Sequence, residues 1–294
     1  MSDDPTSGTP AAPKPEQFPR SSALPIQSPL YWVAEKDRYL RQLLIRDIQA
    51  QTKRTLIVYF SVWDQRAQIT PGDDIYFNEM LGDVKGGQAD LMIETAGGFT
   101  DTTEKIAALL RVHIPDLRVI VPCRAKSNGT ILTLVGGSIV MGPCSELGPA
   151  DPFIQIAPNN SVPAHHILGA QNADPIFRQA ADDAIKQTKK LARSLLETGM
   201  MKGRQNQEIE ACVQALASRD HYHSHGSVID ADEALRLGLT VTKLTANDDL
   251  WQRMWLLRCM YESDAQKSQT LKMFEGPYIS NRLRAPPAAT AAKP

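Results

Sequence analysis

The sequence lacks a charge excess, and it lacks cysteines at the spacing of a redox or metal site. Its 32 lysines and arginines and 33 acidic residues give a formal net charge of −1, so charge gives no argument for nucleic acid or an anionic membrane as a partner. The four cysteines, Cys123, Cys144, Cys212 and Cys259, form no C-x-x-C pair. Because cysteine in an apolar run behaves as a small hydrophobic residue, we expect free thiols in a reducing compartment.

A long apolar run is also missing. The longest, residues 131–141, contains a Gly-Gly pair and is too short to span a bilayer. The amino-terminal stretch MSDDPTSGTPAAPKPEQFPR has acidic residues near its start and no apolar core of the kind that a secretory signal needs. We therefore expect a cytoplasmic protein with no transmembrane segment.

Both ends of the chain are rich in small residues and proline and have little apolar surface to bury. We expect residues 1–29 to form a disordered tail and residues 283–294 a flexible tail. The whole chain is 42% hydrophobic and 22% charged, which is typical of a folded domain. We place that single domain at residues 30–282.

Short apolar segments alternate with helical patterns in the first half of the domain. Strands are expected at residues 55–62, 90–94, 117–121 and 138–141, and helices at 31–51, 75–81, 100–113 and 128–135. Beyond them we expect a loop at 154–174, helices at 175–198, 205–218 and 230–237, a strand at 239–244, and a final helix or pair of helices at 247–274. The alternation predicts an α/β fold with a mostly parallel sheet and right-handed crossovers.

Two glycine-bearing turns follow expected strands, at residues 95–98 and 126–129. The carboxyl ends of parallel strands lie at one edge of a sheet, where ligands bind in such folds. Glycine lets another group approach the backbone closely, and two backbone N–H groups aimed at one point would stabilise an oxyanion. The spacing of the two turns therefore indicates a candidate site.

Ser127 begins the helix that follows the second turn. One interpretation is an ordinary helix N-cap, in which the hydroxyl accepts a hydrogen bond from the first turn. The other is a nucleophile, because an alkoxide is least unfavourable near unpaired N–H groups at the positive end of a helix. The serine alone does not decide between them.

The motifs ETAGG, AKSNGT and SIVMGPCSELGPADPFI, followed by DEALRLGL at residues 232–239, resemble the serine dehydrogenase proteinase family. That family is grouped with proteins similar to signal peptide peptidase A and Clp protease in the ClpP/crotonase superfamily. The resemblance covers residues 55–244, and its most specific element is LGPADP. It implies a ClpP/crotonase-like spiral of ββα units with added C-terminal helices, a homo-oligomer, and polypeptide substrates.

The resemblance also implies a serine peptidase in which Ser127 is the nucleophile. Gly97, Gly98 and the backbone N–H of Asn128 would hold the oxyanion. The base has two candidates, because related peptidases use a lysine from a later helix and the pair Ser224-His225 resembles a Thr-His position of the family. Of the lysines on the helix at 175–198, we favour Lys186, beside an apolar residue, provided that burial lowers its pKa.

The sequence departs from the family pattern around this site. Asn128 replaces a small residue and is expected to crowd the oxyanion hole or add a donor to it. Asp183 stands where relatives often have lysine, and Thr95-Ala96 replaces a proline. These changes leave open a second function, a catalytically inactive scaffold or partner-binding protein of the same fold.

Other chemistry has weaker support. His221, His223 and His225 alternate, but no carboxylate or cysteine is spaced to complete a metal site, so we expect no metal and no cofactor. Glu146 and Asp151 could form an acid pair, although carboxylates beside glycine and proline more often hold turns. A crotonase-like acyl-CoA enzyme is a third, more distant possibility, against which the LGPADP element and the serine after Lys126 argue.

Overall fold

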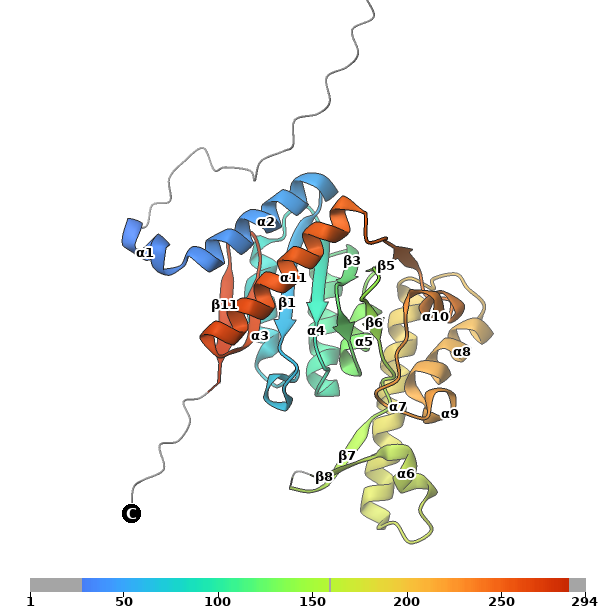
Figure 1. Ribbon diagram of the computed structural model, residues 1–294. Helices are drawn as coiled ribbons and strands as arrows, with labels where there is room; N and C mark the ends of the chain where they lie inside the picture. Colours follow the sequence, from blue (N-terminus) through green and yellow to red (C-terminus); the bar gives the residue numbers. More distant parts are fainter. Residues whose placement is uncertain (1–27, 159, 286–294) are drawn as a thin grey trace, which may run out of the picture.

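The computed structural model describes residues 28–158 and 160–285 of the chain. Its centre is a seven-stranded sheet in the order β11-β10-β1-β2-β3-β5-β9 (Figure 1). The strands are β1 (Thr55–Ser61), β2 (Gln88–Glu94), β3 (Asp116–Val121), β5 (Ser138–Met141), β9 (Val241–Lys243), β10 (Thr270–Glu275) and β11 (Ser280–Arg284). β1, β2, β3, β5 and β9 run parallel, whereas β10 and β11 pair antiparallel. The predicted α/β fold with a mostly parallel sheet is therefore confirmed.

Helices cover both faces of this sheet (Figure 1). They are α1 (Pro29–Ala34), α2 (Lys36–Thr52), α3 (Asp73–Met80), α4 (Thr100–His113), α5 (Asn128–Thr133), α6 (Ala164–Gly169), α7 (Pro175–Thr198), α8 (Asn206–Ala217), α9 (Arg219–Tyr222), α10 (Ala231–Arg236) and α11 (Asp249–Ser268). Two 3-10 turns, η1 (Gln65–Ala67) and η2 (Leu81–Asp83), flank α3. No helix in the described part of the chain is long and apolar enough to cross a membrane.

β1 explains why both faces are covered, because all but its first residue are buried. Successive side chains of a strand point to opposite faces. Val58 and Phe60 pack with α2 and α11, while Ile57 and Tyr59 pack in the larger core with α3, α4 and α5. An all-apolar strand of this kind is stable only between two layers of helices.

Residues 154–174 were expected to be a loop, and this prediction is wrong. The segment forms most of a hairpin of β7 (Phe153–Ala157) and β8 (Asn160–Pro163), followed by α6. The hairpin and α6 project from the body with the first half of α7 (Figure 1). Ile154, Val162 and Ile167 pack there with Ile185 of α7 in a small separate core. Packing against α7, rather than local periodicity, determines this structure.

The expected final helix at 247–274 is also wrong at its end. α11 stops at Ser268, and Gln269 takes a left-handed conformation with φ 51°. The chain then returns along β1 as β10 and turns into β11. β11 includes residues 283 and 284, which we had placed in the flexible tail, while residues 1–27 and 286–294 of the predicted tails lie outside the described chain.

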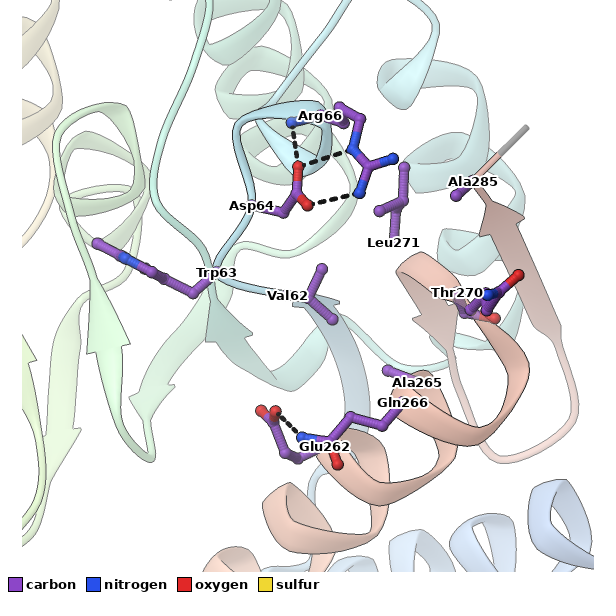
Figure 2. A pocket seen from close by; sticks show the side chains of 11 residues that line it. Val62, Trp63, Asp64, Arg66, Glu262, Ala265, Gln266, Thr270, Leu271 and Ala285 are labelled. Atoms are coloured by element: carbon purple, nitrogen blue, oxygen red, sulfur yellow. Dashed lines mark hydrogen bonds and ion pairs between the residues drawn. The ribbon is translucent and has the colours of Figure 1, made fainter. Parts of the chain in front are cut away.

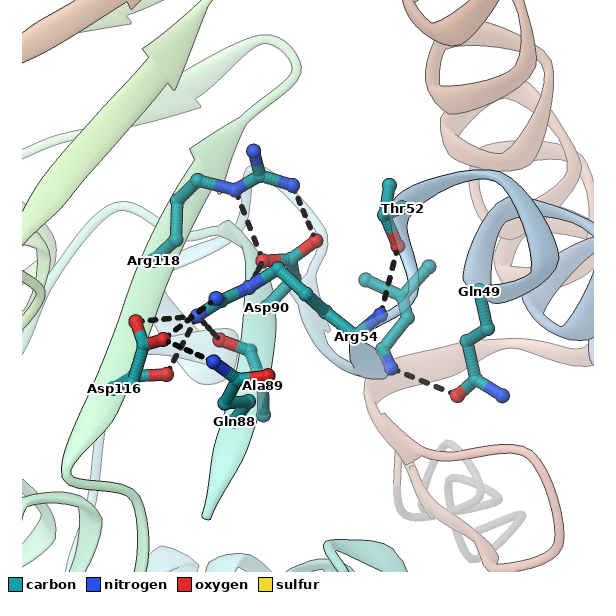
Figure 3. Close-up of polar contacts among 9 residues, drawn as sticks. Gln49, Thr52, Arg54, Gln88, Ala89, Asp90, Asp116 and Arg118 are labelled. Carbon is teal, nitrogen blue, oxygen red and sulfur yellow. Dashed lines mark hydrogen bonds and ion pairs between the residues drawn. The ribbon is translucent and has the colours of Figure 1, made fainter. Parts of the chain in front are cut away.

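Ion pairs hold the edge of the sheet at which the parallel strands begin. At the edge where β2 begins, the buried carboxylate of Asp90 accepts from Arg54 Nε at 2.7 Å and from Arg118 Nη2 at 2.7 Å (Figure 3). Arg54 also binds the exposed Asp116. These ion pairs join the loop before β1 to β2 and β3 and stabilise that edge.

Replacing Asp90 by Asn should lower the free energy of unfolding by about 2 kcal/mol, because hydrogen bonds to charged groups contribute about 1.5–3 kcal/mol. The side chain of Asp116 is 53% exposed, so Asp116→Asn is a matched control that should cost less than about 1 kcal/mol. Guanidinium chloride unfolding measures both. Equal effects of the two substitutions would contradict the structural role given to Asp90.

Candidate active site

Ser127 lies in a sharp turn between β4 (Arg124–Ala125) and α5. Its backbone has φ 53° and ψ −126°, a conformation that costs a non-glycine residue about 1–3 kcal/mol and that concentrates at functional sites. A serine on a strained strand-to-helix turn is also the arrangement that exposes the nucleophile of α/β hydrolases. Lys126 and Asn128 on either side are buried, whereas Ser127 is partly exposed.

The hydroxyl of Ser127 does not cap the helix. Ser127 occupies the N-cap position of α5, but its side chain accepts no capping hydrogen bond in the described structure. The N-cap interpretation of this serine is therefore wrong. The strained backbone instead presents a hydroxyl that is not used by the helix.

Gly97 brings the first turn into contact with Ser127. A Cβ on Gly97 would lie 2.7 Å from Ser127 Cβ and 2.9 Å from the backbone nitrogen of Asn128. Its φ of 95° also favours glycine. The N–H of Gly97 is used within its own turn, where it donates to Thr95 Oγ1 at 3.2 Å. Gly97 therefore permits close approach and is not itself a free donor.

Gly98 is held from behind by Ile69. Ile69 N–H donates to Gly97 O at 2.7 Å, and Phe99 N–H donates to Ile69 O at 2.9 Å. Any Cβ on Gly98 would come within 2.2 Å of Ile69 O. The N–H and the carbonyl of an extended residue between two such bonds both point away from the neighbouring segment. The N–H of Gly98 therefore points away from Ile69, in the same direction as the carbonyl of Gly98, which faces Asn128.

The side chain of Asn128 binds the glycine turn and not the space beside Ser127. Its Nδ2 donates to Gly98 O at 2.5 Å and to Thr100 Oγ1 at 3.1 Å. Among the described residues, the Asn128 side chain therefore neither crowds the expected oxyanion hole nor adds a donor to it. The backbone N–H of Asn128 is in the first turn of α5, where helical amides have no intrahelical acceptor. Within residues 28–158 and 160–285, the backbone N–H groups of Gly98 and Asn128 have no acceptor.

Lys126 fixes the position of the LGPADP segment, a role not expected from the sequence. It is only 5% exposed, and its Nζ donates to Leu147 O and Ser227 O, both at 3.1 Å. Glu146 lies 3.2 Å from the same ammonium. Burial lowers the pKa of Lys126, and the Glu146 carboxylate opposes that shift.

His225 is paired with a buried carboxylate. Its Nδ1 lies 2.7 Å from Asp151 Oδ1, and Arg219 Nη1 donates to Asp151 Oδ2 at 3.0 Å. The side chain of Asp151 is fully buried and that of His225 is 30% exposed. His225 stands two residues before Ser227, whose carbonyl binds Lys126 beside the serine. The structure therefore joins the segment that contains His225 to the side chain of Lys126, the residue before Ser127. The sequence signal for the partner of His225 was the aspartate of the LGPADP element.

Glu146 and Asp151 do not form an acid pair, since each is paired with different cations. No group of three histidine, cysteine or acidic side chains able to hold a metal occurs among the described residues. His221 instead lies 3.6 Å from Glu233 on the surface.

Lys186 does not have the environment that a lysine base needs. Its side chain is 70% exposed and lies 2.5 Å from Asp182 one turn earlier on α7. A hydrogen bond to Asp182 raises the pKa of Lys186, whereas a base near neutral pH requires a lowered pKa. Asp183, at the position where relatives often have lysine, is exposed and accepts from Gln179.

A pocket elsewhere in the fold contains none of the residues of the two glycine turns. This pocket of about 500 Å³ lies between the end of β1 and the end of α11 (Figure 2). Arg66 binds Asp64 across its rim and lowers the pKa of that carboxyl to about 2. Trp63 in its lining stacks on Arg124, with the guanidinium 4.9 Å from the ring centre.

Comparison with known proteins gives relatives of two kinds. Two uncharacterized proteins of Methanocaldococcus jannaschii are similar in sequence, one 29% identical over 192 residues and the other 33% identical over 111 residues. The first alignment covers 64% of this chain and 63% of the relative, and the second 37% and 38%. The chain thus spans less than two thirds of the length of these curated relatives.

Solved structures with a similar fold include two mutants of the membrane-bound stomatin-specific protease 1510-N, one of them in complex with a substrate peptide. They are 20% and 17% identical, with TM-scores of 0.41, and the matches cover 69% and 74% of this chain and 80% and 83% of theirs. A ClpP1 mutant from Listeria monocytogenes is 13% identical with a TM-score of 0.45, over 69% of this chain and 98% of that one.

The profile of the ClpP-like SDH-type serine proteinases matches residues 83–285. This match includes both glycine turns, the LGPADP element and the DEALRLGL segment. It confirms the resemblance and the ClpP-like fold expected from the motifs. The chain belongs to the family of ClpP-like SDH-type serine proteinases.

Proposed function

We propose that this protein is a serine peptidase that hydrolyses peptide bonds through an acyl-enzyme on Ser127. The observation that carries the proposal is the backbone of Ser127, held at φ 53° against Gly97 with its hydroxyl unused by the helix. Strained residues of this kind cluster at active sites, where the strain is part of the mechanism, and this favours a peptidase over an inactive scaffold.

The geometry supports a role for each turn. Ser127 Oγ would attack the carbonyl carbon of a peptide bond, and the new oxyanion would accept from the N–H groups of Gly98 and Asn128. Each such donor typically lowers the barrier by about 3–4 kcal/mol. Collapse of the tetrahedral intermediate would expel the amine, and water would then hydrolyse the ester.

We propose His225 as the base that takes the hydroxyl proton, in place of Lys186. Asp151 holds Nδ1 of the ring, which leaves Nε2 to accept the proton and later return it to the leaving amine. A carboxylate in this position fixes the tautomer and stabilises the imidazolium. Lys186, exposed and paired with Asp182, lacks the corresponding properties.

Polypeptides are the substrates that membership of this proteinase family implies. The homo-oligomer and the cytoplasmic location stay predictions. Large apolar side chains exposed on the projecting hairpin and α7, such as Phe153, Ile156 and Ile176, are consistent with a contact between subunits.

A fluorophosphonate probe should label the wild-type protein, and Ser127→Ala should abolish the label because no other residue is proposed to react. Gel fluorescence and mass spectrometry of the labelled peptide measure this. Labelling at a residue other than Ser127, or none on the correctly folded wild type, would refute the proposed activity in favour of the scaffold.

Removing the proposed base should slow acylation. We expect His225→Gln to lower the second-order labelling rate by about 10²–10⁴-fold, the usual contribution of a general base. Lys186→Met is the control and should react at the wild-type rate. The opposite pattern would reassign the base to the lysine.

The strain at Ser127 should be measurable as stability. Ser127→Gly relieves a positive φ that costs about 1–3 kcal/mol but adds entropy to the unfolded chain, so we expect a net gain of about 1 kcal/mol. Ser127→Ala keeps the strain and should match the wild type within about 0.5 kcal/mol. Urea unfolding gives both values, and a loss of stability in the glycine variant would contradict the strained geometry.

A further inference from the structure

The oxyanion hole depends on a segment that contributes no group to it. In the proposed mechanism the N–H of Gly98 faces the reacting carbonyl. Ile69 holds the backbone on either side of Gly98, because its N–H donates to Gly97 O and its carbonyl accepts from Phe99 N–H. Ile69 belongs to the connection between η1 and α3, and its fully buried side chain packs in the larger core. The connection has a further, polar anchor at the next residue, Thr70.

A buried lysine provides that anchor. Lys272 of β10 places its Nζ 2.7 Å from Thr70 Oγ1, the residue directly after Ile69. The same ammonium donates to both carboxylate oxygens of Asp73, at 2.9 and 2.8 Å. Asp73 in turn accepts from Thr70 N–H at 3.0 Å. Lys272 and Asp73 thus bind both the side chain and the backbone of Thr70.

The burial of this cluster makes it rigid. The side chains of Lys272 and Asp73 are 3% and 2% exposed. A buried ion pair contributes little net stability relative to apolar packing, but losing one partner leaves an uncompensated charge. The pair therefore resists any displacement of Thr70 that would stretch these bonds. Asp73 and Lys272 are 199 positions apart in the sequence, so the pair links distant parts of the fold.

We propose that the Lys272–Asp73 pair is a positioning device for the oxyanion hole, holding Thr70 and Ile69 so that the N–H of Gly98 faces the reacting carbonyl. This inference rests on the proposed peptidase function. Lys272 and Asp73 do not touch the substrate in this scheme. Their effect reaches the reaction through Thr70, Ile69 and Gly98.

The test compares labelling rates and peptide hydrolysis of full-length variants at a temperature where each is fully folded. Thr70→Val keeps the ion pair and removes only the hydroxyl acceptor, while Lys272→Met removes the anchor. Displacing a catalytic group by about 1 Å can cost on the order of 10²-fold. We expect Lys272→Met to lower kcat by about 10–100-fold and Thr70→Val by a smaller factor, with KM unchanged, because the oxyanion exists only after the substrate has bound.

Asp90→Asn is the matched control, since it weakens a buried ion pair at the opposite edge of the sheet. It should lose stability but keep the wild-type kcat. If Thr70→Val and Lys272→Met lose stability but keep the wild-type kcat, the pair only holds β10 to α3. That result would overturn the inference. If Lys272→Met does not fold, Thr70→Val decides the question.

The two proposals fail in different ways. A wild-type protein that the probe does not label refutes the peptidase function, and the positioning role falls with it. A labelled wild type whose Lys272→Met and Thr70→Val variants keep its kcat refutes the positioning role alone.

Discussion

The close approach of two turns is the constraint on which the rest of this site depends. Gly97 lies against Ser127 Cβ and the backbone of Lys126 and Asn128, where even a methyl group would not fit. The parallel bridge between Thr95 and Ala125 brings the turns together, because the sheet places the ends of neighbouring strands at one edge. The strained backbone of Ser127 lies at this contact, between the buried residues Lys126 and Asn128.

Buried charges hold the segments that surround this contact. Lys126 binds the carbonyls of Leu147 and Ser227, and Asp151 binds Arg219 and His225. Each of these groups joins parts of the chain that are distant in sequence. Because an unpaired charge in the interior is costly, such pairs specify how the loops dock more than they add to stability.

The parallel sheet could be predicted from the sequence, while its antiparallel edge could not. The strand at 55–62 is apolar on both faces, and this pattern alone predicts that both faces are buried. β10 continues the apolar pattern of α11 without a glycine or proline between them, and only a left-handed Gln269 ends the helix. The hairpin at 153–163 has no period of its own, and its few apolar side chains are buried only by α7.

The sequence by itself indicated the two turns of the candidate site, because glycine at 97 and 98 and the LGPADP element are local requirements for close backbone approach and a tight turn. The partners of those turns were decided by the tertiary structure. The sequence left Lys186 and His225 as candidate bases, with Lys186 the favoured lysine, yet folding exposes Lys186 beside Asp182 and pairs His225 with buried Asp151. Burial and the identity of a charged neighbour set the chemistry of a titratable group, and both arise only when distant segments pack together.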